Sequence, residues 1–235
     1  MEFGAMIGDS FAYAKEGVMG NTGRWFKLII ATLLLELPLM GYIMKILRGE
    51  KPAPEVENWG SLFIDGIKLL IVYIIWLIPV IIVYGIMMIA MGAAFMSGGE
   101  EAGAMAGLAI AGIFGLILFV LYIIIALLLP IAIVRFARTG NFGEALNFSA
   151  IRAHIGKIGW ISYIIALILG GIVVAIPIVI IEVILMIIVG VLTAALSYIG
   201  IILGFLIFGI VILIIAPVIA VFYSRYITLI FDSVS

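Results

Sequence analysis

The sequence predicts an all-α protein, a polytopic integral membrane helical bundle with about five transmembrane helices and additional amphipathic interfacial helices. Hydrophobic residues make up 67% of the chain and charged residues 11%, and the mean hydropathy is +1.46. Soluble domains are about half apolar and a quarter charged, so this composition excludes a water-soluble fold. Two stretches, 68–135 and 157–225, are almost wholly apolar. Because a helix needs only about 20 apolar residues to cross about 30 Å of hydrocarbon, each stretch holds more than one crossing.

The composition also excludes several functional classes. The net charge is −1 and the basic residues are dispersed along the chain, so we expect no nucleic-acid partner. The absence of cysteine excludes disulfides, thiolate nucleophiles and cysteine-ligated metals. His154 is the only histidine, and alone it makes neither a metal site nor a serine-type triad. We therefore expect no enzymatic activity, no cofactor and no metal.

The chain is expected to form a single membrane domain over residues 1–235. An N-terminal amphipathic segment, 1–25, precedes the first crossing, and two polar loops, 48–68 and 135–157, each contain an interfacial helix. The last apolar stretch is long enough for two long crossings or three short ones, and we expect two. The five expected crossings are 26–47, 69–96, 103–134, 158–189 and 196–224.

The placement of charges sets the expected topology. Lysine and arginine gather in the loops 48–68 and 135–157, whereas the turn between the second and third crossings carries only Glu100 and Glu101. The positive-inside rule then places both loops in the cytoplasm. Arg225 follows the final crossing, which favours a cytoplasmic C-terminus and an even number of crossings in the last stretch. We expect a multi-pass protein of the cell membrane.

The first apolar segment, 26–47, has basic residues on both sides, so charge does not orient it. A single crossing with an external N-terminus is the preferred interpretation. The alternative is a re-entrant hairpin with its tip near Glu36 and Pro38, which would keep the N-terminus in the cytoplasm.

Two glutamates within the apolar segments are candidate functional residues, because ionisable groups in a membrane are costly and often functional. Glu36 lies near the middle of its segment, where it could carry a proton or bind a cation, and a hydrogen-bonded structural role is the simpler explanation. Glu182 is expected near the external interface, where its side chain would reach the lipid headgroups.

Small residues recur at every fourth position in the third crossing, which lets another helix approach closely. Packing within the chain is the simpler explanation of this pattern, and a homo-oligomer interface is the alternative. The residues are Gly99, Gly103, Gly107, Ala111 and Gly115.

Aromatic residues mark three stretches that approach the membrane with helical apolar spacing. We expect these stretches to form interfacial helices whose aromatic faces lie at headgroup depth. The alternative is that they extend the neighbouring crossings. The aromatic residues are Phe3, Trp59, Phe63 and Phe142.

A run of about 30 residues resembles the signature of a family of archaeal and bacterial membrane proteins, domain of unknown function 4013. Lys45 stands where an arginine is usual, which retains the charge. The resemblance implies a prokaryotic, more often archaeal, multi-span membrane protein without an established activity, and it implies no catalytic residue. The residues that carry it are Pro38 to Tyr42, Arg48 to Glu50, Pro54, Trp59, Leu62, Phe63 and Asp65 to Lys68.

These observations favour a non-enzymatic membrane-embedded protein that acts as a scaffold or organises lipid. Membrane lipids are the expected partners, together with further copies of the same chain in a homo-oligomer. A transporter or channel that uses Glu36 at mid-membrane is the alternative function. The sequence specifies no small-molecule substrate.

Overall fold

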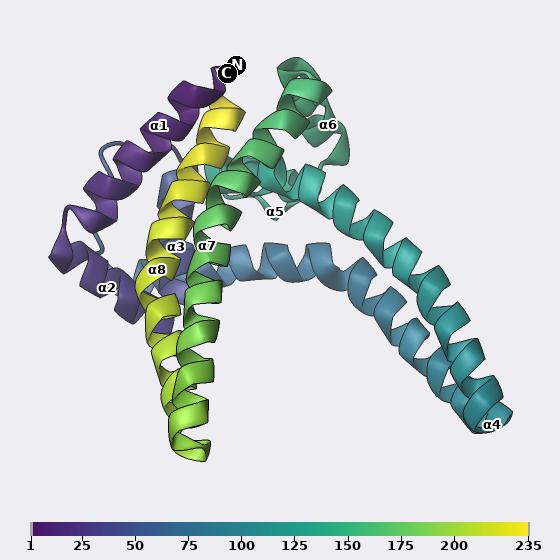
Figure 1. Ribbon diagram of the computed structural model, residues 1–235. Helices are drawn as coiled ribbons and strands as arrows, with labels where there is room; N and C mark the ends of the chain where they lie inside the picture. The colour runs from purple at the N-terminus through teal and green to yellow at the C-terminus, as the bar shows by residue number, and fades with distance from the viewer. Residues whose placement is uncertain (1, 235) are drawn as a thin grey trace.

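The computed structural model describes residues 2–234, and every regular element in that range is a helix. Two long helical hairpins extend from a group of shorter helices that lies beside the chain termini (Figure 1). The predicted all-α class is confirmed. The elements are α1 (Phe3–Ala14), the π-helical turn η1 (Lys15–Met19), α2 (Thr22–Leu33), α3 (Leu37–Leu47), α4 (Trp59–Thr139), α5 (Phe142–Ala145), α6 (Phe148–Ile158), α7 (Trp160–Leu196) and α8 (Tyr198–Asp232).

The first hairpin is α4, which folds back on itself at Gly99. The backbone there has φ 67° and ψ −172°, a conformation that essentially only glycine adopts. Next to the turn the two arms lie side by side, with Gly103 packed against Phe95, and they diverge towards their bases (Figure 1). The turn therefore falls between the second and third expected crossings.

The second hairpin consists of α7 and α8, which meet at Ser197 with φ 53° and ψ −128°. Beyond the turn, Gly200 lies against the backbone of Leu192 and Gly204 lies against Val189. These two glycines allow the helices to pack closely at the end of the hairpin. In the described residues, α4, α7 and α8 are the helices long and apolar enough to cross a membrane.

The first apolar segment differs from the single crossing helix that we preferred. It forms two short helices, α2 and α3, because Leu35 and Glu36 adopt left-handed conformations with φ 57° and 62°. Pro38 then lies in the first turn of α3, where its missing N–H costs nothing. The helices have 12 and 11 residues, so each is about 18 Å long or less and cannot cross about 30 Å alone. The chain therefore turns at Leu35 and Glu36, close to where the alternative interpretation placed the tip of a hairpin.

The three approach segments also differ from one another. The N-terminal segment forms the separate helix α1, and the loop before the last apolar stretch contains α5 and α6. By contrast, the stretch that begins at Trp59 is continuous with α4. For this stretch the structure has the alternative arrangement, in which the approach segment extends the crossing.

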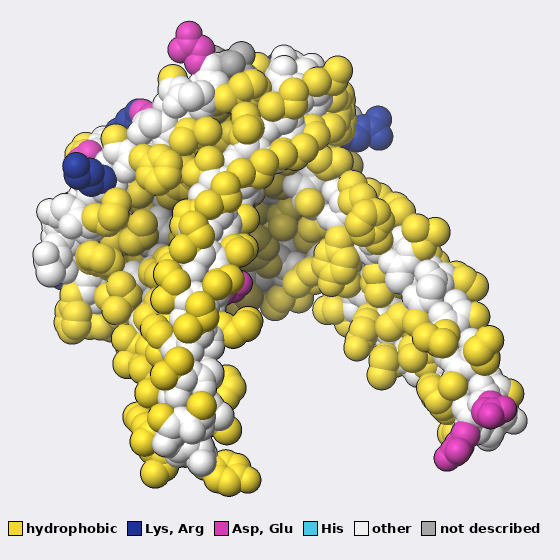
Figure 2. Space-filling model, in the orientation of Figure 1, with side chains coloured by type: hydrophobic (Ala, Val, Ile, Leu, Met, Phe, Trp, Pro, Cys, Tyr) yellow, Lys and Arg dark blue, Asp and Glu magenta, His cyan; other side chains and the backbone are white. Residues whose placement is uncertain are grey.

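The core lies where the bases of the hairpins meet the shorter helices. Its largest buried side chains include Trp76, Phe136, Tyr163 and Tyr226. We call the group formed by α1, η1, α2, α3, the loop 48–58, α5 and α6 the platform. Charged side chains appear on the platform and at the tip of one hairpin, whereas apolar side chains cover both hairpin arms (Figure 2). So large an exposed apolar surface is that of a membrane protein.

Candidate functional site

The platform is joined to the first hairpin by a close contact between α3 and the start of α4. A Cβ atom at Gly41 would overlap the carbonyl group of Leu62, and one at Gly66 would overlap the carbonyl group of Leu37. Each helix therefore contributes one glycine that lets the partner backbone approach. Three of these four residues belong to the run that carries the family resemblance. Sequence reasoning had not assigned them a structural role.

Two arginines connect the ends of α3 and α4 to each other, and one of them also contacts α8. Arg48 donates from Nε to the carbonyl of Ala137 (3.3 Å), and Arg138 donates from Nε to the carbonyl of Leu47 (2.9 Å). Arg138 also binds both carboxylate oxygens of Asp232, at 2.8 and 2.9 Å. Gly49 has φ 91°, and a Cβ there would lie 2.9 Å from the Arg138 guanidinium. The end of α3 is thus fixed against both α4 and α8.

The N-terminal helix is held to α8 by a buried cation. Arg225 is 3% exposed and donates from Nε to Asp9 (2.7 Å), while its guanidinium lies 5.2 Å from the centre of the Tyr13 ring. Lys51 approaches the other oxygen of Asp9 at 3.1 Å. Tyr13 in turn donates to the carbonyl of Glu50. Residues far apart in the chain therefore meet at one end of the molecule.

Three platform carboxylates have pKa values below their ordinary range. Hydrogen bonds from Arg24 and Arg135 lower the pKa values of Glu55 and Glu144, respectively. Partial burial by itself raises the pKa of Asp9, but its hydrogen bonds with Arg225 and Lys51 outweigh that effect and lower it.

Acid is expected to loosen the platform. A carboxylate whose pKa is lowered on folding stabilises the folded protein at any pH above its pKa in the unfolded chain, which is about 4. This stabilisation is lost as the pH falls through the pKa of the same group in the folded protein. The apparent unfolding temperature in mild detergent should therefore decrease more steeply below about pH 4 than between pH 5 and 7. The variant Asp9→Asn should show a shallower decrease. Parallel pH profiles for the two proteins would contradict a role of Asp9 in this loss.

A lateral groove lies between α3, the first arm of α4, α7 and α8. It consists of two neighbouring cavities of about 520 and 440 Å³ that share several lining residues. Glu36 and Glu182 are the charged residues among those that line the two cavities. The shared lining residues are Ile43, Tyr73, Ile178, Ile219 and Ala220.

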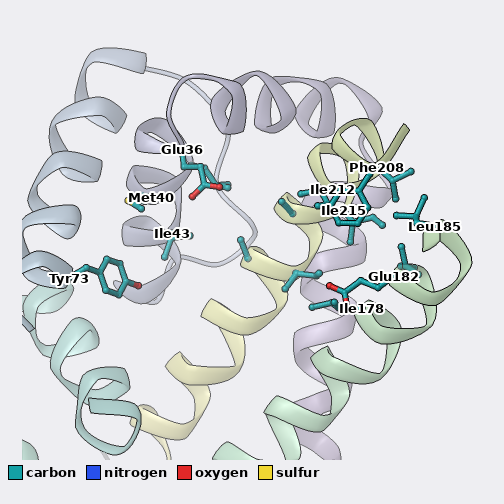
Figure 3. A pocket seen from close by; sticks show the side chains of 16 residues that line it. Glu36, Met40, Ile43, Tyr73, Ile178, Glu182, Leu185, Phe208, Ile212 and Ile215 are labelled. Atoms are coloured by element: carbon teal, nitrogen blue, oxygen red, sulfur yellow. The ribbon is translucent and has the colours of Figure 1, made fainter. Parts of the chain in front are cut away.

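The two candidate glutamates, far apart in the sequence, face the same cavity. Glu36 lies at the left-handed turn before α3, and Glu182 lies on α7 (Figure 3). Their carboxylates enter from opposite walls. Glu182 precedes the turn at Ser197 by roughly 20 Å of helix at 1.5 Å per residue. Glu182 therefore lies on the apolar arm itself and not at the turn, and its place near the external interface stays a prediction.

The small-residue series of the expected third crossing has two different environments in α4. Gly103 and Gly107 are buried against Phe95 of the other arm, whereas Gly99 forms the turn. Ala111 is half-buried, and nothing lies within 4 Å of a Cβ built at Gly115. The first part of the series therefore packs within the hairpin.

Leucine at Gly103 should destabilise this hairpin. The new side chain would meet the backbone of Ala94 and Phe95 at about 3 Å, and overpacking of this kind costs about 1–3 kcal/mol. The apparent unfolding temperature should fall, and the mass of the detergent-solubilised species should not change. Gly115→Leu is the matched control and should have little effect. Dissociation of an oligomer by Gly103→Leu would contradict packing within the chain as the role of this glycine.

The four aromatic residues predicted to lie at the interface are all half-buried. Phe3 and Phe142 pack against the main core, and the Phe142 ring lies 4.9 Å from that of Phe136. Trp59 packs against a second buried cluster that includes Tyr42 and Leu62. Phe3, Trp59 and Phe142 thus contribute to the packing where the platform meets the hairpins.

A family model described as a protein of unknown function (DUF4013) matches residues 26–189, more than half of the chain. The chain belongs to this family. The DUF4013 match extends from α2 into α7 and includes Glu36, Glu182 and the glycine contact between α3 and α4. No curated protein and no solved structure matches the chain. In residues 2–234, no group of three or more histidine, aspartate or glutamate side chains is placed to hold a metal ion.

Proposed function

We propose that this protein organises lipid as a membrane-embedded scaffold, by placing more protein in one leaflet of the bilayer than in the other. The observation that carries this proposal is the uneven distribution of helices along the long hairpins. The short helices and both ends of the described chain lie beside the hairpin bases, and the far end consists of the two hairpin turns (Figure 1).

The short helices have exposed apolar side chains that suit insertion into lipid. Phe26 on α2 is 63% exposed, and Leu33 and Leu35 at the α2–α3 turn are 59% and 83% exposed. A helix pair of about 18 Å reaches the middle of a hydrocarbon layer of about 30 Å. On this proposal the α2–α3 pair occupies a single leaflet.

The charges support the cytoplasmic leaflet as the one that contains the platform. Arg48, Lys51 and Arg138 lie at the hairpin bases, whereas Glu100 and Glu101 lie at the α4 tip. The positive-inside rule assigns the basic end to the cytoplasm. Extra protein volume in the cytoplasmic leaflet expands that leaflet relative to the other one, so the membrane should curve with its convex side toward the cytoplasm. Shallow helices bind membranes in a way that depends on this curvature.

Vesicle size provides the test. The protein is reconstituted at a fixed protein-to-lipid ratio, and diameters are measured by electron cryomicroscopy. Because the natural chain has no cysteine, a cysteine introduced at Ser233 reports orientation through a membrane-impermeant thiol reagent. Vesicles with the platform outward should be smaller than protein-free vesicles. Equal diameters at high protein density would overturn the proposal.

Two double variants test whether vesicle diameter depends on apolar side chains of the platform in particular or on exposed apolar surface in general. Leu33→Ser with Leu35→Ser removes exposed apolar side chains from the platform. Met105→Ser with Leu108→Ser removes side chains of similar exposure, 70% and 71%, near the other end of the molecule. The first pair should bring the vesicle diameter back toward the protein-free value, and the second should not.

Transport through the membrane is the second candidate function, favoured by the meeting of Glu36 and Glu182 in one groove. Cation flux into proteoliposomes should then fall after Glu36→Gln, while Glu100→Gln at the hairpin tip serves as the control. Unchanged flux in the Glu36 variant would contradict this function.

A further inference from the structure

We propose that the groove between α3, α7 and α8 binds a lipophilic organic cation, with its charge between Glu36 and Glu182 and its apolar body along the groove. This binding site is independent of the leaflet asymmetry described above. Binding here requires neither transport nor a change in membrane shape.

The backbone holds the two carboxylates on opposite walls of the cavity (Figure 3). Glu36 follows Leu35 in a left-handed turn, and α3 is fixed against α4 by the contacts of Gly41 and Gly66. Glu182 lies on α7, whose position is fixed by close packing with α8. A ligand in this cavity would therefore lie between two walls whose backbone positions are already set by these contacts.

The charges in the groove favour a cation. Neither Glu36 nor Glu182 forms an ion pair with a described residue, and no lysine, arginine or histidine lines either cavity. An isolated carboxylate in an apolar environment is costly unless it is neutralised or paired. Basic residues of the platform do not supply that pairing, because they bind Asp9, Glu55, Asp65, Glu144 and Asp232.

The remainder of the lining favours an organic ion over a metal ion. Side chains such as Met40, Phe208 and Ile212 line the same cavity as the two glutamates, and Tyr73 lines both cavities. A hard metal ion takes about six oxygen ligands, which this lining does not supply. Cavities of about 520 and 440 Å³ match the size of small-molecule sites, and the rings of Phe208 and Tyr73 suit a cation with an apolar body.

Two probes of the same shape and opposite charge test the proposal. Radiolabelled tetraphenylphosphonium is equilibrated by dialysis with the full-length protein in lipid nanodiscs, and uptake by empty nanodiscs is subtracted. Tetraphenylborate is treated identically. The cation should show saturable binding at one site per chain, and the anion should show none. Saturable binding of both ions to a similar extent would indicate apolar partition alone and would overturn the proposal.

Variants that keep the side-chain shape but remove the negative charge then test which carboxylates bind the cation. Glu36→Gln and Glu182→Gln should each raise the dissociation constant of tetraphenylphosphonium at least about tenfold, the change that corresponds to one lost favourable interaction of about 1.4 kcal/mol. Glu100→Gln and Glu101→Gln at the hairpin tip should leave it unchanged. Circular dichroism and gel filtration establish that each variant is folded. If Glu36→Gln disturbs the α2–α3 turn, Glu182→Gln, which lies in the middle of a helix, still tests the contribution of a carboxylate to binding. Affinity retained in the folded variants would overturn the proposal.

Discussion

Alanine at Gly66 should prevent the platform from docking on the first hairpin. The added Cβ would overlap the main-chain carbonyl of Leu37, and neither helix can move away without losing the reciprocal contact between Gly41 and Leu62. Because the obstacle is backbone and not a flexible side chain, we expect a cost above about 3 kcal/mol, at the upper end for overpacking. Gel filtration in mild detergent should show loss of the monodisperse species, and the remaining folded protein should unfold at a lower temperature.

Gly60 provides the matched control on the same helix. Nothing lies within 4 Å of a Cβ built there, so Gly60→Ala should leave stability unchanged or raise it slightly through better helix propensity. Gly41→Ala should resemble Gly66→Ala, and the double variant should cost less than the sum, because the first substitution already separates the helices. A monodisperse Gly66→Ala protein with an unchanged unfolding temperature would refute the close contact between α3 and α4.

Alanine at Asp9 should release the N-terminal helix from α8. The substitution removes the carboxylate beside Arg225 and leaves a cation that is only 3% exposed without its acidic partner. Loss of one member of a fully buried ion pair costs about 3–5 kcal/mol, and the partial exposure of Asp9 reduces our expectation to about 2 kcal/mol. Hydrogen–deuterium exchange measured by mass spectrometry should increase across residues 3–14 and stay unchanged at the hairpin tips.

Lys51→Gln removes the second cation from the same carboxylate and serves as the control. The Lys51 side chain is 53% exposed, and exposed pairs contribute less than about 1 kcal/mol. Exchange in α1 should therefore change little. Equal exchange in α1 for Asp9→Ala and the natural protein would show that the pair does not hold this helix.

The local features of the fold could be predicted from the sequence to a large extent. Apolar length indicated the long hairpins, and the glycine-rich turn and the small residues that follow it indicated where the first one folds back. The first segment was harder, because its composition fits a crossing, and what breaks it is the pair of left-handed residues Leu35 and Glu36. Non-glycine residues rarely adopt this conformation, so no sequence signal distinguished a turn from a kinked helix.

The candidate site could be predicted only in its parts. Glu36 and Glu182 were recognisable as costly charges in apolar segments, but their shared cavity depends on how α3 and α7 pack around α8. The roles of Gly41 and Gly66 were likewise hidden, since a glycine in a helix gives no indication of which backbone approaches it.

The sequence by itself determined that this chain is helical and resides in a membrane. The free energy of moving apolar side chains out of water, and that of hydrogen-bonding each amide within its own helix, add nearly residue by residue along the chain. Tertiary structure alone decided which residues meet: Asp9 with Arg225, Gly66 with Leu37, and Glu36 opposite Glu182. Such meetings depend on the relative positions of whole helices, and those positions follow from close packing over many residues at once.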